Sequence, residues 1–447
     1  MRDTLVIGAG SSGLAAAKNL RQAGFEVEVV EREGDLGGNW NIAGEQARVY
    51  ASTHMISSKP FTQYPDFPMP DADPDYLHHT QVLAYLRRYA RHFGVDRLIR
   101  FSTEVTGCEP LEDGGWRVTL RDRTSGATEV VEYARLVVAN GHNWFPKRPS
   151  YPGQESFTGE VLHSAEYHHA DQLAGRRVVV VGAGNTGCDI VVEAAQRAEV
   201  AYHSTRRAYW YAPKYALGRP ADQVSDLIFS LGLPIRTTQW LFEKTARLVV
   251  GRYERLGLPT PDHRFLETHP TVNQTLLYHV GHGDITPVPD IARFDGDVVE
   301  FTDGRRVTAD LVVFATGYLI RFPFLDEDAL HWRDGRPLLY RNLFHPGRDD
   351  LFVIGLIQPD SGQFCLVHWQ TVLLARFLQL QRARPDLAAA WLSDGADHLD
   401  ERAQGGVQLL DSTRHAIEVE HLDYIQVLDR DIARLGTLLR DEVRVGA

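Results

Sequence analysis

The stretch Thr4-Leu5-Val6-Ile7-Gly8-Ala9-Gly10-Ser11-Ser12-Gly13 decides the fold of this chain. Its first residues are typical of a short buried strand, and a Gly-x-Gly-x-x-Gly motif follows at once. The next residues, from Leu14 to Leu20, have helical propensity and spacing. After a break at Gly24, the segment from Val27 to Glu31 is typical of a second parallel strand. The sequence therefore predicts a β-α-β unit at the start of the chain.

Each glycine of this motif has a physical task at a dinucleotide site. Gly8 allows the tight turn, Gly10 lets the backbone approach a pyrophosphate, and Gly13 lets the helix pack closely on the strand. The N–H groups at the start of the helix attract phosphate charge. Glu31 ends the second strand, where a carboxylate can accept both hydroxyls of an adenosine ribose. The alternative interpretation is an ordinary glycine turn with a solvated Glu31.

A second unit of the same kind begins in the middle of the chain. Arg177 to Val181 predicts a strand, Gly182-Ala183-Gly184-Asn185-Thr186-Gly187 repeats the glycine motif, and Asp189 to Ala195 predicts a helix. Its next strand ends in Ser204-Thr205-Arg206-Arg207, with guanidinium groups where the first unit has an acid. Guanidinium suits a 2′-phosphate, so this site should favour NADPH, unless the arginines are an ordinary exposed basic pair.

Free ribose hydroxyls at one site and a 2′-phosphate at the other predict a flavoprotein in which NADPH passes a hydride to FAD. The predicted fold class is α/β, with two Rossmann-like dinucleotide-binding domains, the NADPH domain being inserted in the FAD domain. We expect the first part of the FAD domain at residues 1–165, the NADPH domain at 166–299, and the second part with C-terminal helices at 300–447. The glycine motifs leave the later path of the electrons open, because disulfide reductases, oxidases and oxygenases share them.

Two further segments give structural expectations. Val298 to Val307 alternates like a hairpin around Asp303-Gly304, and Leu311 to Phe314 is typical of a buried strand, at which we expect the chain to have returned to the first domain. The stretch from Tyr209 to Tyr253 is rich in aromatic residues and leucine and predicts helices at the domain interface. Its apolar residues are expected to belong to the core and not to a membrane contact.

The charge, the cysteine content and the lack of targeting segments argue against several classes of binding partner and cell compartment. The chain has 447 residues and a formal charge of −12 without a strong basic run, which argues against nucleic acid and anionic membranes. Its three cysteines are far apart and form neither a Cys-x-x-Cys motif nor a disulfide framework. We expect a cytoplasmic protein, because the start of the chain has no signal-peptide pattern and no stretch approaches a membrane span. A homo-oligomer is left open.

The segment Phe157-Thr158-Gly159-Glu160-Val161-Leu162-His163-Ser164-Ala165-Glu166-Tyr167 is the most specific signal. It matches the Phe-x-Gly-x-x-x-His-x-x-x-Tyr/Phe sequence that identifies flavin-containing monooxygenases and lies just before the second glycine motif, as in that family. By this resemblance, His163 is a structural histidine that links domains. Other segments resemble the family in the same order: Gly37-Gly38-Asn39-Trp40, Pro65-Asp66-Phe67-Pro68, Phe314-Ala315-Thr316-Gly317-Tyr318, and Gly355-Leu356-Ile357-Gln358-Pro359 with Gln370.

The resemblance runs from Leu5 to about Gln370 and is closest to the soluble, bacterial type of these class B flavoprotein monooxygenases. The segment Asp429 to Ala447 has regularly spaced charges instead of the hydrophobic anchor of the animal enzymes. The resemblance implies that FAD reduced by NADPH reacts with O2 to a C4a-hydroperoxide, which a soft amine or sulfide attacks. Tyr167-His168 stands where the Baeyer–Villiger branch of the family has Trp-Pro, so oxygenation of nitrogen or sulfur is favoured over oxygenation of ketones, which stays an alternative.

One position departs from the family pattern. Where the family has an active-site asparagine, counted back from Lys59, this chain has Ile56. In the family that amide is thought to support the flavin hydroperoxide and the bound NADP, and an isoleucine can do neither. His54 and Ser57 are nearby polar candidates for the role, although each is more often a simple loop residue. A largely uncoupled NADPH oxidase that produces H2O2 is therefore a second alternative.

The candidate catalytic positions are thus Ile56, His54 and Ser57, and no metal ligands are predicted. The candidate cofactor-binding residues come from both glycine motifs, from the ends of the strands that follow them and from the family segments; they are Gly8, Ala9, Gly10, Ser11, Ser12, Gly13, Glu31, Arg32, Gly38, Asn39, Trp40, Gly182, Gly184, Asn185, Thr186, Gly187, Ser204, Thr205, Arg206, Arg207, Thr316, Gly317 and Gln358. Two rival functions are a disulfide reductase, which would need a cysteine pair beside the flavin, and a nucleotide-binding sensor that performs no oxygenation.

Overall fold

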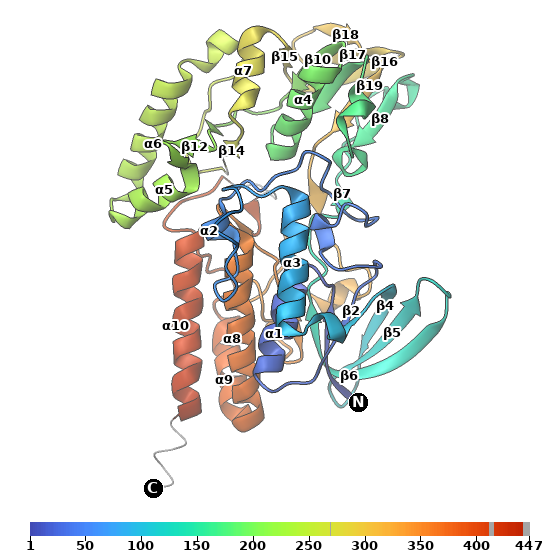
Figure 1. Cartoon of the computed structure of the whole chain (residues 1–447), viewed down its shortest axis with the longest axis vertical. Helices are drawn as coiled ribbons and strands as arrows, with labels where there is room; N and C mark the ends of the chain where they lie inside the picture. Colours follow the sequence, from blue (N-terminus) through green and yellow to red (C-terminus); the bar gives the residue numbers. More distant parts are fainter. Residues whose placement is uncertain (269, 411–414, 441–447) are drawn as a thin grey trace.

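Two β-sheets, each accompanied by helices, form the two halves of the molecule (Figure 1). The computed structural model describes residues 1–268, 270–410 and 415–440. The last residues of the charged C-terminal segment discussed above, 441–447, lie outside the described residues.

The first sheet has seven strands in the order β3-β2-β1-β6-β5-β4, with β23 also paired to β6. The strands β1, β2, β3, β6 and β23 are parallel where they pair, whereas β4, β5 and β6 form an antiparallel meander. The bounds are β1 Arg2–Ile7, β2 Val27–Val30, β3 Ile99–Arg100, β4 Thr103–Pro110, β5 Trp116–Asp122, β6 Thr128–Val138 and β23 Leu351–Val353.

The second sheet has five parallel strands in the order β15-β10-β9-β19-β8. Their bounds are β8 Glu160–His163, β9 Arg177–Val181, β10 Val200–Ser204, β15 Ile285–Val288 and β19 Leu311–Phe314. Both predicted β-α-β units are present, with α1 (Ser11–Gln22) between β1 and β2 and α4 (Asn185–Arg197) between β9 and β10. The helices begin before and end after their predicted cores, because each glycine turn leads directly into the first helical turn.

The sequence predicts that the chain has returned to the first domain from about residue 300. This prediction is wrong for the strand Leu311–Phe314 and for the hairpin that precedes it. Leu311–Phe314 pairs with β9 and β8 in the second sheet. The predicted hairpin exists as β17 (Val298–Phe301) and β18 (Arg306–Thr308), but its Val299 and Phe301 pack in one core with Val179 and Val181 of β9. A buried apolar strand fits the centre of either sheet, so its residues alone did not specify which one. The chain returns to the first half through β20 (Tyr318–Leu319), which pairs with β7 (Phe145–Pro146).

The remaining elements are short strands, α-helices and 3-10 turns. The further strands are β11 Tyr211–Ala212, β12 Tyr215–Ala216, β13 Arg219–Pro220, β14 Thr271–Val272, β16 Ile291–Asp295, β21 Trp332–Arg333, β22 Arg336–Pro337, β24 Gln358–Pro359 and β25 Glu418–Val419. The further helices are α2 Lys59–Thr62, α3 His79–Phe93, α5 Ala221–Ser230, α6 Ile235–Val250, α7 Thr275–His282, α8 Gln363–Ala383, α9 Pro385–Ala396 and α10 His421–Arg440. Short 3-10 turns are η1 Gly38–Trp40, η2 Asp96–Leu98, η3 Gln154–Ser156, η4 Ser164–Glu166, η5 Ala170–Leu173, η6 Tyr253–Leu256 and η7 Glu327–Ala329.

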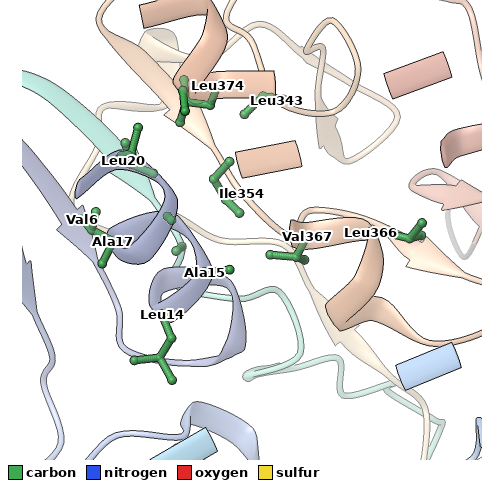
Figure 2. Packing of buried hydrophobic residues seen from close by; sticks show 14 of the residues in the cluster. Val6, Leu14, Ala15, Ala17, Leu20, Leu343, Ile354, Leu366, Val367 and Leu374 are labelled. Carbon is green, nitrogen blue, oxygen red and sulfur yellow. The ribbon is translucent and has the colours of Figure 1, made fainter. Parts of the chain in front are cut away.

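The helix α8 packs against α1, which begins at the first glycine motif, and α10 packs against α8. Figure 2 shows Ala15 and Leu20 of α1 facing Ile354 and the α8 residues Val367 and Leu374. All of these side chains are buried, and the small alanine side chains of α1 let the α8 backbone come close. The start of α1 is therefore held in place by a packed core of the protein's own side chains.

The helices predicted between Tyr209 and Tyr253 are present as α5 and α6. The expectation that the apolar residues of this stretch belong to the core is confirmed in part, since Trp210, Tyr211 and Tyr253 are buried in the core of the second half and Phe242 packs against it. No residue of α5 is buried, and large apolar side chains point outward on both helices, among them Leu227, Trp240 and Leu248. The two helices project from one end of the molecule (Figure 1). Phe229 and Phe242 join the two helices, with their rings 5.9 Å apart, and Phe242 also stacks on Phe265 at 5.3 Å.

Candidate functional site

The first glycine turn is closed by backbone contacts that exclude side chains. Gly8 has a φ of +105°, and a Cβ on it would lie 2.7 Å from the Ala139 carbonyl oxygen at the end of β6. A Cβ on Gly13 would lie 1.8 Å from the Gly8 carbonyl oxygen, so α1 starts against the turn. Gly10 precedes the helix, and its first N–H groups have no side-chain cap. This bare, close-fitting helix N-terminus is suited to a pyrophosphate.

Glu31 is buried at the end of the second strand, where the ribose hypothesis requires it. Its side chain is 6% exposed and accepts hydrogen bonds from the Ala9 N–H at 2.7 Å and the Glu33 N–H at 2.9 Å. Burial raises the pKa of the Glu31 carboxyl, and the two N–H groups oppose that rise. The carboxylate thus has a fixed direction and keeps lone pairs for two hydroxyl donors. The neighbouring Arg32 is held by carboxylates, with Glu33 at 3.3 Å and Glu45 at 3.2 Å.

Two later segments line the same helix start. Gly38, with a φ of +53°, lies so close to Gly10 that a Cβ on it would be 3.2 Å from the Gly10 Cα. Gly355 lies on Ser12, because its Cβ would come 2.2 Å from the Ser12 Oγ. The Gly355 N–H donates to the buried Gln370 Oε1 at 3.0 Å. The family-like segments 37–40 and 355–359 therefore meet at the first motif, although Asn39 is exposed and Gln358 donates to Glu418 at 3.1 Å.

The second glycine turn repeats this construction. Gly182 has a φ of +118°, and its Cβ would lie 2.4 Å from the Ala315 carbonyl oxygen at the end of β19. The Cβ of an alanine at 187 would lie 2.1 Å from the Gly182 carbonyl oxygen. Thr316 and Gly317 follow Ala315 and therefore belong beside this second turn and not beside the first. Gly184 precedes α4 without a side-chain cap, and Asn185 accepts from the Val272 N–H at 2.9 Å.

The end of β10 presents positive charge to solvent. Arg206 and Arg207 are exposed, and neither forms an ion pair or hydrogen bond with any residue that the structure describes. Ser204 and Thr205 are buried, and the Ser204 Oγ donates a hydrogen bond to the Pro289 backbone carbonyl at 2.8 Å. Two unpaired guanidinium groups beside a bare helix N-terminus fit a phosphate ester. At the corresponding place, the first unit has the buried Glu31.

The loop of residues 50–58 lies between the two halves. Tyr50 donates to Asp189 of α4 at 2.6 Å, and Ser52 donates to Glu193 of the same helix. At its other end, the Ser58 N–H donates to Asp222 of α5 at 2.5 Å. The loop thus bridges the first half of the molecule to helices of the second half.

The three candidate catalytic positions lie on this loop but are not equivalent. Ile56 is 41% exposed and is an apolar surface where the family pattern has an amide. The Ser57 hydroxyl lies 2.8 Å from the Thr62 hydroxyl. The His54 Nδ1 lies 2.7 Å from the Ser52 carbonyl oxygen, so it is the protonated nitrogen, and the exposed ring leaves Nε2 as an acceptor. Of the three side chains, we therefore consider His54 the best candidate to accept a hydrogen bond from a ligand, through its Nε2.

A buried polar network next to this loop was not predicted from the sequence. Lys214 donates to the Met55 carbonyl at 3.2 Å, directly before Ile56, and burial lowers its pKa while Asp189 opposes that shift. Asp189 also accepts from Asn273 at 2.7 Å, and burial raises its pKa. Lys214 and Asn273 lie far from the glycine motifs in sequence, and no local pattern marks them.

His163 is a satisfied structural histidine, as expected. Its ring is fully buried, its Nδ1 accepts from the Ala165 N–H at 3.1 Å, and its Nε2 donates to the Gly317 carbonyl at 3.1 Å. Burial lowers its pKa to about 4, so the ring is neutral. Because Gly317 precedes β20, the histidine holds the point at which the chain crosses between the halves.

The sequence also contained a signal that was missed. Leu136-Val137-Val138-Ala139-Asn140-Gly141 after the first motif corresponds to Val312–Gly317 after the second, and each segment supplies the carbonyl that faces its glycine turn. His142 follows directly and contacts the Gly355 backbone, and burial lowers its pKa to about 4. An internal comparison of the two halves would have placed residues 139–142 at the first site and Leu311–Phe314 in the second sheet.

Comparison with known proteins matches this architecture. The model of the flavin-binding monooxygenase-like family matches residues 2–439. The chain belongs to this family. It is 31% identical over 450 residues to flavin-containing monooxygenase 5 of Homo sapiens, covering 95% of this chain and 81% of that protein. It is 30% identical over 446 residues to dimethylaniline monooxygenase [N-oxide-forming] 2 of Oryctolagus cuniculus, covering 96% of this chain and 82% of that protein.

Solved structures of flavin monooxygenases share the fold. A steroid monooxygenase bound to NADP has a TM-score of 0.73 at 21% identity, with 98% of both chains covered. The S-allyl-L-cysteine S-oxygenase of Allium sativum has a TM-score of 0.68 at 21% identity, covering 97% of this chain and 88% of that chain.

Family membership makes the chain a flavin-dependent oxidoreductase of the monooxygenase class. The rival disulfide reductase lacks its redox pair, since Cys108, Cys188 and Cys365 lie on β4, α4 and α8. Within the described ranges, no helix has the length and apolar character needed to cross a bilayer.

Proposed function

We propose that this chain uses FAD and NADPH to insert one oxygen atom of O2 into a soft nucleophile, an amine nitrogen or a sulfide sulfur. The observation that supports it best is the difference in charge between two otherwise equivalent glycine turns. The first has the buried acceptor Glu31, and the second has the exposed Arg206 and Arg207, which form no ion pair with the residues that the structure describes. FAD with its free ribose hydroxyls fits the first site, and NADPH with its 2′-phosphate fits the second.

The protein residues of both sites fit these groups. Gly10 and Gly38 leave open backbone where a Cβ would intrude, and the uncapped start of α1 can bind the FAD pyrophosphate. The uncapped start of α4 and the two arginines can bind NADPH. When bound, the reduced flavin supplies the chemistry that activates O2 for transfer of one oxygen atom.

The residues of this chain then bind, orient and exclude water. The loop 50–58 joins the two halves, so it can keep the nicotinamide and flavin ends of the two cofactors together. No strong acid or base is required of the protein, because a tertiary amine or a sulfide is already a nucleophile. A polar donor near Ile56 would be needed only to protect activated oxygen from loss as H2O2.

A direct test combines cofactor analysis with product analysis. The purified protein should be yellow and release FAD on denaturation, and NADPH oxidation should be matched by N-oxide from N,N-dimethylaniline or by sulfoxide from a dialkyl sulfide. Absence of flavin, or FMN alone, would refute the assignment of the first site. Lactone or ester from a ketone, without N- or S-oxide, would establish Baeyer–Villiger oxygenation instead.

A second candidate function is an NADPH oxidase that releases most of its reducing equivalents as H2O2. The observation that favours it is Ile56, an apolar side chain on the bridging loop where the family pattern has an amide. A ratio of H2O2 to consumed NADPH close to one in the presence of saturating amine or sulfide would support this function over oxygenation.

A further inference from the structure

A small cavity lies outside the two dinucleotide sites, between the β21–β22 hairpin and α10. Its volume is about 20 Å³, and its lining includes Arg336, Arg341, Asn342, Arg402, Glu418 and Tyr424. A space of this size holds one water-sized body. Three of the lining side chains are guanidinium groups, although the chain as a whole is acidic.

Arg336 is the unusual member of this group. Its side chain is 4% exposed, and no described residue accepts a hydrogen bond from it or forms an ion pair with it. Burial lowers its pKa, and the charge of Arg402 adds to that effect. An ionised group buried without a partner is costly, and arginine does not lose its proton in proteins. Asp400 and Asp334 favour its charged form from beyond ion-pair distance, and no described carboxylate contacts the guanidinium directly.

The neighbouring carboxylates are engaged elsewhere. Asp400 accepts from Arg333 at 2.5 Å, and Glu401 lies 3.3 Å from Arg341 and 2.8 Å from His398. Glu418 lies 2.9 Å from His415 and accepts from Gln358. Arg341 also donates to the buried Asp431 at 2.8 Å.

The backbone beside the cavity is held in a costly conformation. Arg341 and Asn342 have φ values of 56° and 52°, in the left-handed region that residues with a side chain rarely adopt. This turn is the one that places Arg341 in the cavity wall. Strain of this kind is typical of ligand sites, because the energy of binding can offset it.

We propose that the cavity beside Arg336 binds one small monovalent anion of the size of chloride. Its charge would neutralise Arg336, and its small size matches the cavity, which is too small for a phosphate ester or an organic acid. The bound anion joins β22 to α10, because Arg336 of β22 and Tyr424 of α10 both line the cavity. Tyr424 in turn donates to the Arg341 carbonyl at 2.6 Å and accepts from Gln370 at 2.7 Å, the residue that holds Gly355.

The test compares thermal unfolding in sodium chloride and in sodium gluconate at equal ionic strength, since gluconate is too large to enter. Chloride at tenfold its dissociation constant should raise the Tm by about 1.5 °C above the gluconate value, and the effect should saturate. Arg336→Met should abolish the difference, because methionine offers no charge for the anion. The control Arg117→Met removes a charge from an exposed side chain of β5 and should keep the difference.

Identical Tm values in chloride and gluconate, or a chloride effect that survives in Arg336→Met, would overturn the proposal. A direct measurement covers the case in which the variant does not fold. Crystals of the unaltered protein grown in sodium bromide should show an anomalous peak within about 3.5 Å of an Arg336 nitrogen. Lack of such a peak at full bromide occupancy elsewhere in the same crystal would also overturn it.

Discussion

Glu31 directly follows the second strand of the first unit, whereas the corresponding residue of the second unit is the uncharged Thr205, with Arg206 next to it. This difference in charge is what distinguishes the two units. Glu31 is fixed by two N–H groups in a buried position, so a phosphate placed there would meet a carboxylate in a medium of low dielectric constant. Arg206 is exposed and forms no ion pair with a carboxylate in the part of the chain that the structure describes. One side chain at each site therefore carries much of the cofactor selectivity that we propose.

Replacing Arg206 with alanine should weaken the preference for NADPH over NADH. A hydrogen bond to a charged group contributes about 1.5 to 3 kcal/mol, so the ratio of kcat/KM for the two nucleotides should fall about tenfold to a hundredfold. Arg293→Ala, which removes an exposed arginine paired with Glu300 on the β16–β17 hairpin, is the matched control. An unchanged ratio in both Arg206→Ala and Arg207→Ala would place the 2′-phosphate elsewhere.

Replacing Ile56 with asparagine should lower the H2O2 released per NADPH consumed. The amide can donate a hydrogen bond to activated oxygen, and one such contact of about 1 to 1.5 kcal/mol corresponds to about a fivefold to tenfold change in the rate of peroxide loss. The measurement is a peroxide assay against NADPH absorbance, with stopped-flow mixing of the reduced protein with oxygen. Low peroxide release in the unaltered protein that rises in His54→Ala, with no effect of Ile56→Asn, would give the role to His54.

At the scale of elements, α1 can begin directly at the glycine turn only because residue 13 is a glycine and has no Cβ. The Cβ of an alanine at position 13 would overlap the Gly8 carbonyl oxygen, which is backbone and cannot move aside. The packing of α1 on α8 also prevents the helix from shifting to make room for a Cβ, since Ala15 and Leu20 are fully buried (Figure 2). The helix cannot move away from the turn without opening the core.

Gly13→Ala should therefore destabilise the protein by about 1 to 3 kcal/mol and weaken flavin retention, because the turn must widen. Gly436→Ala is the matched control. It lies within α10 with only the Arg440 guanidinium near its Cβ, at 3.9 Å, so it should stabilise by about 1 kcal/mol through helix propensity. Chemical denaturation together with flavin fluorescence measures both effects. Equal stability of the two variants would show that the turn is less constrained than the contact distances indicate.

For the whole molecule, buried neutral histidines determine how stability depends on pH. Burial lowers the pKa of several of them from 6.5 to about 4; these are His163, His203, His345, His368 and His421. They are distributed over both halves of the chain, with His203 in the second sheet and His421 at the start of α10. Above pH 6.5, the imidazoles are neutral in both the folded and the unfolded states. As the pH falls, the unfolded chain takes up protons first.

The free energy of unfolding should therefore fall as the pH decreases from 6.5 towards 4, by about 2 kcal/mol for each such histidine at pH 5. His345→Asn should reduce this dependence, since the Asn oxygen can replace the Nδ1 that accepts from the Gly347 N–H. The exposed His282→Asn is the control. The measurement is Tm between pH 7 and pH 5, and an unchanged slope in His345→Asn would show that His345 is already protonated or solvated.

The sequence by itself determined the two β-α-β units, because a glycine turn between an apolar strand and a helix is a local pattern with few alternatives. It also gave the family resemblance, which the comparisons confirm, and the structural role of His163. The difference in charge between Glu31 and Arg206 could likewise be derived without a structure, since both follow directly from the register of their strands.

Only the tertiary structure decided which strands share a sheet and which distant residues meet. Leu311–Phe314 is apolar enough for either sheet, and its place was fixed by pairing with β9 and β8, far away in sequence. Lys214 and Asn273 meet Asp189 beside the bridging loop, and Arg336 is buried without a partner among the described residues, because chain segments that are remote in sequence close around them. Burial and charge balance depend on all the neighbours of a residue in space, and a local sequence pattern contains only its neighbours along the chain.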